Sequence, residues 1–294
     1  MKLPYVQHTS SFERHQQNLT RVLLGLHHFG YLRYAELARL VWPMSSAASR
    51  QANASRFFKQ LCEEKLIHRC LNSIGTYSYV LTGKGAREVR KLISVPAFDG
   101  TRIMGVQGVE VYHRTLGTAW LVEQLIAGHE VLSEFAINSL PGEITRFKLN
   151  RQWGKLPDGL VLREVCDEAG QLLHYNVDWL EVESSYKSPA QRDRLMEMAW
   201  CLGKQLLSDT PYYLDRIVFL YASTSKHEGA LVRSAVAKFR ATRHEIDDPK
   251  GLLGSIALVS ADASLPLRIR GFSEVDLYSY MQRDPKLSKL LIDV

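Results

Sequence analysis

Residues 66–81, LIHRCLNSIGTYSYVL, carry the pattern that decides the fold of the first third of the chain. Two short runs, Leu66–Leu71 and Thr76–Leu81, flank an Asn/Gly turn, which predicts a β-hairpin. The segment before them has helical periodicity instead, because an apolar stripe runs from Ala54 to Leu61 at the spacing of one helix face. The period therefore changes from helix to strand within a few residues.

Helical patterns also lie on both sides of this segment. Apolar residues recur at helical spacing from Leu19 to Leu26, and Tyr34–Val41 forms a second short amphipathic pattern that ends at Trp-Pro. A basic helix is expected after the hairpin, over Ala86–Ile93. The order helix, helix, helix, hairpin, helix is that of a winged helix-turn-helix, and the phrase LxxxxLIHR…YxLTxKG resembles the end of the third helix and the wing in that family.

The charge of the chain is divided in the same way. Residues 1–100 hold 14 Lys/Arg against 6 Asp/Glu, whereas residues 101–294 hold 23 against 25. A basic segment joined to a near-neutral one indicates that the first part meets a polyanion. A solvated basic surface is the alternative interpretation.

The first part therefore predicts contact with double-stranded DNA. A helix fits the major groove, where Asn and Arg pair with adenine and guanine edges. We expect Asn53 and Arg56 to read bases, and we expect Arg50, Lys59 and Lys84 to contact phosphates. A winged helix used only for protein contacts remains the alternative.

Composition excludes several other classes of protein. Apolar residues make up 46% of the chain and charged residues 23%, which is typical of a globular protein with a sizeable core. No window resembles a membrane span or a secretory signal, so we expect a cytoplasmic protein without membrane contact. The four cysteines are scattered without metal-binding spacing, as is typical of reduced thiols.

The rest of the chain alternates helix and strand and predicts an α/β (α+β) domain with a mixed sheet. We expect a winged helix over residues 1–95, a Pro/Gly-containing linker over 96–107, and this second domain over 108–294. The expected elements of the second domain are helices over 109–126, 188–207 and 228–243 and strands over 130–139, 156–163, 174–183, 215–222 and 255–260, followed by a helix pair within 276–294.

Residues 140–155 of this domain are rich in basic and aromatic side chains. Basic groups interleaved with Phe147 and Trp153 predict a surface that holds a DNA strand by phosphate contact and base stacking. A hairpin with a solvated face explains the pattern equally well. The basic residues assigned to DNA here are Arg146, Lys148 and Arg151.

Acidic side chains converge on the next two expected strands. Alternation places Trp179, Glu181 and Glu183 on one strand face, and Asp158 opens the preceding strand. Carboxylates brought together in this way need a positive partner. Three of them form a hard-oxygen site for Mg²⁺ or Mn²⁺, while an exposed face of solvated acids is the alternative.

These acids lie in motifs with a family resemblance. The segments LPDG at 156–159 and LEVE at 180–183 resemble the PD-(D/E)xK nuclease superfamily, which implies a restriction-endonuclease-like domain. The resemblance implies that Asp158 and Glu181 bind the metal. Position 183, where that superfamily usually has Lys, is Glu here, and either Lys187 or Lys155 can substitute for the missing lysine.

The combination of domains resembles a narrower family. A winged helix, a helix with Tyr-His-Arg at 112–114, then PDG and EVE, is similar to the replication-relaxation family and its MobC-type plasmid relaxases. The resemblance covers about residues 15–225. It implies a metal-dependent endonuclease that nicks a plasmid transfer origin during conjugative mobilization, acting on double-stranded DNA and on the single strand at the nick, with a relaxosome accessory protein as a partner.

In that interpretation Asp158, Glu181 and Glu183 hold the metal and Lys187 steadies the scissile phosphate. Tyr186 is a candidate nucleophile, although a metal-activated water needs fewer assumptions. His113 is a candidate auxiliary residue or an ordinary core histidine. The competing hypothesis is a non-catalytic, sequence-specific DNA-binding regulator of plasmid replication or transfer on a degenerate nuclease fold.

Overall fold

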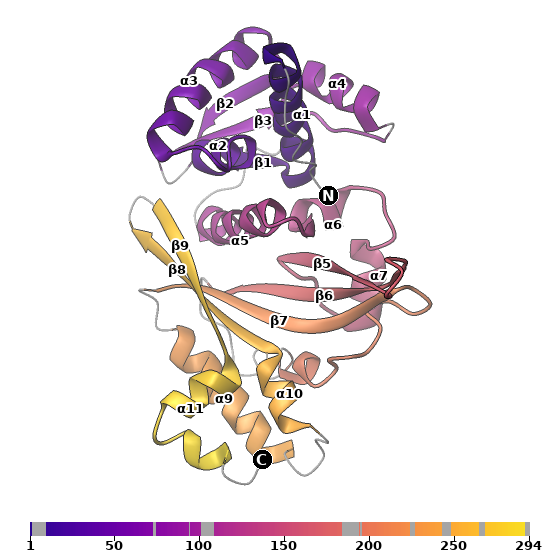
Figure 1. The fold of residues 1–294 in the computed structure, drawn as a ribbon, viewed down its shortest axis with the longest axis vertical. Helices are drawn as coiled ribbons and strands as arrows, with labels where there is room; N and C mark the ends of the chain where they lie inside the picture. Colours follow the sequence, from indigo (N-terminus) through magenta and orange to yellow (C-terminus); the bar gives the residue numbers. More distant parts are fainter. Residues whose placement is uncertain are drawn as a thin grey trace. The chain divides into compact units, whose positions relative to one another are not determined.

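The structure is a computed structural model that describes residues 1, 10–72, 75–93, 95–100, 109–183, 194, 196–223, 227–242, 248–264 and 268–291. It has an α+β fold with a small antiparallel sheet and a larger mixed sheet (Figure 1), so the mixed α/β class expected from the sequence is confirmed. The chain divides into two compact units, Met1–Arg146 and Phe147–Val294. This boundary falls later than the expected linker over 96–107, most of which lies outside the described residues.

Unit 1 begins with the element order of a winged helix. β3 lies between β1 and β2 in an antiparallel sheet, and Leu71 of β2 pairs with Tyr77 of β3. The expected helices and hairpin are therefore present, while β1 was not predicted because three residues are too few to show a period. The elements are α1 (Ser11–Phe29), β1 (Tyr31–Arg33), α2 (Tyr34–Val41), α3 (Ala47–Glu63), β2 (Ile67–Leu71), β3 (Tyr77–Leu81) and α4 (Gly83–Ile93).

Local chemistry sets the ends of these helices. Ser10 and Glu13 form a reciprocal capping box at the start of α1, and Gly30, at φ +75°, ends that helix. The hydroxyl of Ser46 accepts a hydrogen bond from the backbone N–H of Ser49 and begins α3. The apolar residues of α3 are buried in the core of unit 1.

Unit 1 continues past the winged helix through α5 (Val109–Ile126), β4 (Glu130–Ser133) and α6 (Glu134–Ser139). α5 packs on α2, and α6 packs on α1. The prediction of a strand over 130–139 is wrong beyond Ser133. The hydroxyl of Ser133 accepts a hydrogen bond from the N–H of Ala136, and this cap turns the chain into a helix.

Unit 2 is built on strands β5 to β9, which neighbour one another in that order. β6 is antiparallel to β5 but parallel to β7; β7 is parallel to β8, and β8 is antiparallel to β9. Figure 1 shows α9, α10 and α11 gathered at one end of this unit. The elements are α7 (Arg146–Trp153), which begins at the unit boundary, β5 (Gly159–Cys166), β6 (Leu172–Glu183), β7 (Tyr212–Ala222), α9 (His227–Thr242), α10 (Pro249–Gly254), β8 (Ile256–Ser264), β9 (Arg268–Asp276), α11 (Leu277–Arg283) and a 3₁₀ turn, η3 (Ser288–Leu291).

β7 provides the centre of the core of unit 2. Ile217, Val218 and Phe219 are all buried, although their side chains alternate between the two faces of the sheet. A strand with parallel neighbours on both sides and cover on both faces has this continuous apolar pattern. The expectation of a buried strand over 215–222 is therefore confirmed.

Three expectations for unit 2 need correction or addition. A hairpin over 140–155 is wrong, because α7 is a helix whose single buried residue is Leu149. Of the helix expected over 188–207, residues 194 and 196–199 are helical, whereas 200–207 are not, so this prediction is wrong beyond residue 199; residues 188–193 and 195 lie outside the described part of the chain. β9 and α10 were not predicted.

In the part of the chain that the structure describes, no helix combines the length and the apolar composition that a membrane crossing requires.

Candidate functional site

The exposed face of α3 carries the side chains predicted to read DNA bases. Ala54, Phe58 and Leu61 are buried against the rest of unit 1. On other sides of the same helix, Arg56 is exposed and its Nη2 donates a hydrogen bond to Oδ1 of Asn53 at 3.3 Å. The structure therefore brings the two predicted base-reading side chains together on one accessible surface.

The three residues predicted to contact phosphates differ in their surroundings. Lys59 is exposed on α3 and lies 3.8 Å from Glu63. The Nζ atom of Lys84 donates to the carbonyl of Glu64, and Lys84 is also exposed. Arg50 is half-buried, and its guanidinium donates to two backbone carbonyls of the turn between α2 and α3, at Trp42 and Ser45. Arg50 thus braces α3, while Lys59 and Lys84 remain accessible.

The hairpin β2–β3 presents a second accessible surface in unit 1. The guanidinium carbon of Arg69 lies 4.4 Å from the centroid of the Tyr77 ring, a cation–π arrangement. Leu71, which pairs with Tyr77, is 64% exposed.

In unit 2, a buried carboxylate on β6 forms the centre of the predicted acidic site. Both carboxylate oxygens of Glu181 accept hydrogen bonds from Nζ of Lys155, each at 2.7 Å. Nε1 of Trp179 donates to Oε1 of the same carboxylate, also at 2.7 Å. Trp179 and Glu181 therefore share a strand face, as alternation predicts, and a cation compensates the buried charge.

Asp158 lies directly before β5, next to the same part of β6. Its backbone N–H donates to the carbonyl of Leu180, and its Oδ2 accepts a 2.7 Å hydrogen bond from the N–H of Val182. The carboxylate of Asp158 thus extends the β5–β6 ladder beside Glu181. The structure brings Asp158, Glu181 and Lys155 to one end of the β5–β6 pair.

This arrangement does not fit the predicted metal site. Lys155 and Trp179 occupy three of the roughly four acceptor positions of the Glu181 carboxylate. Across the described residues, no three His, Cys, Asp or Glu side chains are grouped as ligands for a metal ion. In the structure, the cation next to Glu181 is the ammonium group of Lys155.

The remaining residues predicted for this site have different positions. Glu183 is 3% exposed at the end of β6. Lys187 and Tyr186 lie outside the described residues. His113 is half-buried in α5 of unit 1.

The basic residues of α7 form a separate accessible surface. Lys148 and Arg151 are exposed. Phe147, which lies between Arg146 and Lys148 in the sequence, is 76% exposed. Trp153 does not join this surface. Its ring packs against Trp179, and its Nε1 donates to the carbonyl of Leu206 at 2.7 Å. Trp153 is therefore a packing residue and is unsuited to the base stacking predicted for it.

A second charged cluster crosses the opposite face of the sheet. Asp178 is 3% exposed and forms ion pairs with Arg163 and Arg216, and Arg163 also reaches Asp215. Burial raises the pKa of Asp178 to about 6, although the two arginines act to lower it. The sequence does not reveal this cluster, because its members lie on three different strands.

No protein-family model matches the chain, and no curated protein matches it in sequence. Arguments about its function therefore depend on its own residues.

The sequence analysis missed the hydrogen bond that Nε1 of Trp179 donates to Glu181 in the acidic site. The signal for it is the spacing of two residues on a strand, which places both side chains on one face.

Proposed function

We propose that this chain is a sequence-specific double-stranded DNA-binding protein that uses α3 as its recognition helix. The observation that carries the proposal is the accessible pair Asn53 and Arg56 on a helix whose opposite face is buried. Both side-chain types pair bidentately with base edges in the major groove. Lys59 and Lys84 supply positive charge for phosphates nearby in the same unit.

The net charge of the first hundred residues supports the same proposal. Phosphate neutralisation by Lys and Arg releases counterions, and this release makes DNA affinity strongly dependent on salt. The resemblance noted in the sequence suggests an origin of plasmid transfer or replication as the target, and such a target implies a cytoplasmic location. The acidic site of unit 2 is then a remnant of a nuclease-like domain.

Selection of bound duplexes from a random pool tests this function. We expect enrichment of one motif, followed by tight and salt-dependent binding of a labelled duplex that contains it, measured by fluorescence anisotropy. A pool that stays random, with equal affinity for the selected and the scrambled duplex, would contradict sequence-specific binding.

A second candidate function is strand nicking, and one observation favours it. Asp158, Glu181 and Lys155 come together at one end of the β5–β6 pair, and these are the residue types on which the PD-(D/E)xK resemblance depends. In this arrangement Lys155 neutralises Glu181 and is accessible enough to approach a phosphate, since its side chain is 30% exposed.

A supercoiled plasmid that carries the selected motif separates the two candidates. Nicking by the wild-type chain that is abolished by Asp158→Ala, while duplex binding persists, would establish the second function. An arm with EDTA and arms with Mg²⁺ or Mn²⁺ test the metal requirement. If the supercoiled band stays unchanged in every arm while specific binding is observed, DNA binding without nicking is the function that remains.

A further inference from the structure

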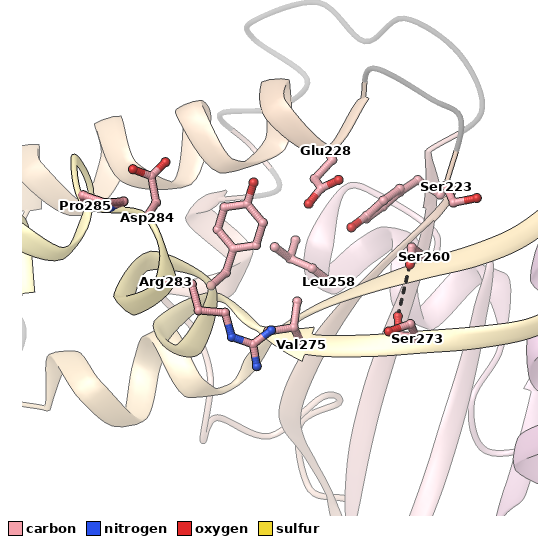
Figure 2. Close-up of a pocket in the computed structure, with 11 residues that line it drawn as sticks. Ser223, Glu228, Leu258, Ser260, Ser273, Val275, Arg283, Asp284 and Pro285 are labelled. Atoms are coloured by element: carbon pink, nitrogen blue, oxygen red, sulfur yellow. Dashed lines mark hydrogen bonds between the residues drawn. The ribbon is translucent and has the colours of Figure 1, made fainter.

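A pocket of about 650 Å³ lies in unit 2 among β7, β8, β9, α9 and α11 (Figure 2). This volume falls within the range of small-molecule sites. The pocket is far along the chain from the acidic site on β5 and β6, and its residues have no part in the function proposed above. Its lining combines carboxylates and hydroxyl groups with an apolar floor that includes Leu258 and Val275.

The carboxylate of Glu228, from the first turn of α9, points into this pocket (Figure 2). Tyr221 of β7 and Tyr280 of α11 line the same pocket and interact electrostatically with Glu228. Burial raises the pKa of both phenols, and the charge of Glu228 raises it further. The phenols therefore stay protonated and neutral beside the carboxylate.

The phenols do not balance the charge of Glu228, because they are neutral. No ion pair to Glu228 is formed among the described residues, so the carboxylate keeps acceptor capacity for a ligand. The lining adds a second acid, Asp284, and one cation, Arg283. Figure 2 shows the guanidinium of Arg283 directed toward Val275 and away from Glu228.

We propose that this pocket binds a small organic cation, an amine or a guanidinium compound, with its charged nitrogen on the carboxylate of Glu228. Leu258 and Val275 provide apolar contact for the carbon chain of the ligand. The hydroxyls of Ser260 and Ser273 lie in the lining as additional hydrogen-bonding groups.

Calorimetric titration of the full chain with agmatine, in the absence of DNA, tests the proposal. We expect saturable binding of agmatine and none of glutarate, a dianion of similar length. Glu228→Gln keeps the shape of the side chain and removes its charge, so we expect affinity for agmatine to fall at least about tenfold. Glu168→Gln, at an exposed acid in the turn between β5 and β6, is the matched control and should bind as the wild type does.

Three outcomes would overturn the proposal: no binding of agmatine by the wild-type chain, equal binding of glutarate, or equal losses of affinity in the two variants. Circular dichroism confirms that each variant is folded. If Glu228→Gln does not fold, the preference of the wild-type chain for agmatine over glutarate shows the charge of the ligand. Asp284→Asn then replaces Glu228→Gln as the variant in which we expect a loss of affinity for agmatine.

Discussion

The Nζ atom of Lys155 lies 2.7 Å from each carboxylate oxygen of Glu181, whose side chain is 1% exposed. The pair joins the segment after α7 to strand β6. The lysine is the cation that compensates this buried carboxylate, which also accepts a hydrogen bond from Nε1 of Trp179, so removal of the lysine leaves a buried charge without that compensation.

Lys155→Met is expected to lower the free energy of unfolding by about 2–3 kcal/mol, at the low end for a broken buried pair because Lys155 is partly solvated. Urea unfolding followed by tryptophan fluorescence measures the change. Lys148→Met, at an exposed position of α7, is the matched control and should change stability by less than about 0.5 kcal/mol. Equal stabilities of the two variants would show that Glu181 does not depend on Lys155.

Gly85→Ala is expected to destabilise unit 1, although Ala is normally the better helix former by about 1 kcal/mol. A Cβ atom at position 85 would lie 2.1 Å from the backbone carbonyl oxygen of Leu66, so α4 or β2 must move. We expect a loss of about 1–3 kcal/mol, as for other overpacked sites. Gly254→Ala in α10 meets no atom within 4 Å and is the control for thermal unfolding.

Arg56→Ala and Lys59→Ala are expected to affect DNA binding in different ways. Loss of a base contact at Arg56 should weaken the selected duplex by about 1–3 kcal/mol and relax the preference at one base position. Loss of a phosphate contact at Lys59 should weaken all duplexes alike and reduce the salt slope by about 1. Anisotropy titrations at several salt concentrations, with matched and mutated duplexes, distinguish the two results.

Asp178 is expected to make the protein less stable as pH rises from about 4 to about 6. The pKa of Asp178 is raised to about 6 in the folded chain, against an ordinary value of 3.8. Within this window the folded state binds more protons than the unfolded state, so the stability contributed by the protonated acid is lost on ionisation, by about 3 kcal/mol in all.

The stability difference between Asp178→Asn and the wild type, measured by urea unfolding across this window, tests the assignment. We expect the free energy of unfolding of Asp178→Asn to increase relative to that of the wild type as pH rises through 6. Glu168→Gln, at an exposed position of the turn between β5 and β6, is the control for the loss of a surface carboxylate. Parallel pH profiles of Asp178→Asn and the wild type would contradict a raised pKa.

Hydrophobic periodicity was sufficient to predict helices α1 to α4, the β2–β3 hairpin and the strand β7, but not the three-residue strand β1. It failed where a short polar contact decides the conformation. Over 130–139 apolar residues alternate in a way compatible with a strand, but the hydroxyl of Ser133 caps a helix. In α7 one buried residue, Leu149, is too little to reveal a helical period.

The candidate site was predictable in part for a related reason. Alternation along β6 places Trp179 and Glu181 on one face, and this much follows from local sequence. The pairing of Glu181 with Lys155 depends on how the chain returns to β6 from α7, which no local pattern encodes. The pocket around Glu228 combines three strands and two helices and was likewise not predicted.

The mixed orientation of β6 has a consequence for the order of folding. β5 and β6 are antiparallel neighbours joined by a turn over 167–171, whereas β7 and β8 become parallel neighbours after the long excursion through α9 and α10. Closing a long loop costs more chain entropy than closing a short one, so the antiparallel β5–β6 and β8–β9 pairs are positioned to form before the parallel pairs. Pulse-labelled hydrogen exchange during refolding is then expected to protect the amides of these two antiparallel pairs first and those between β7 and β8 last.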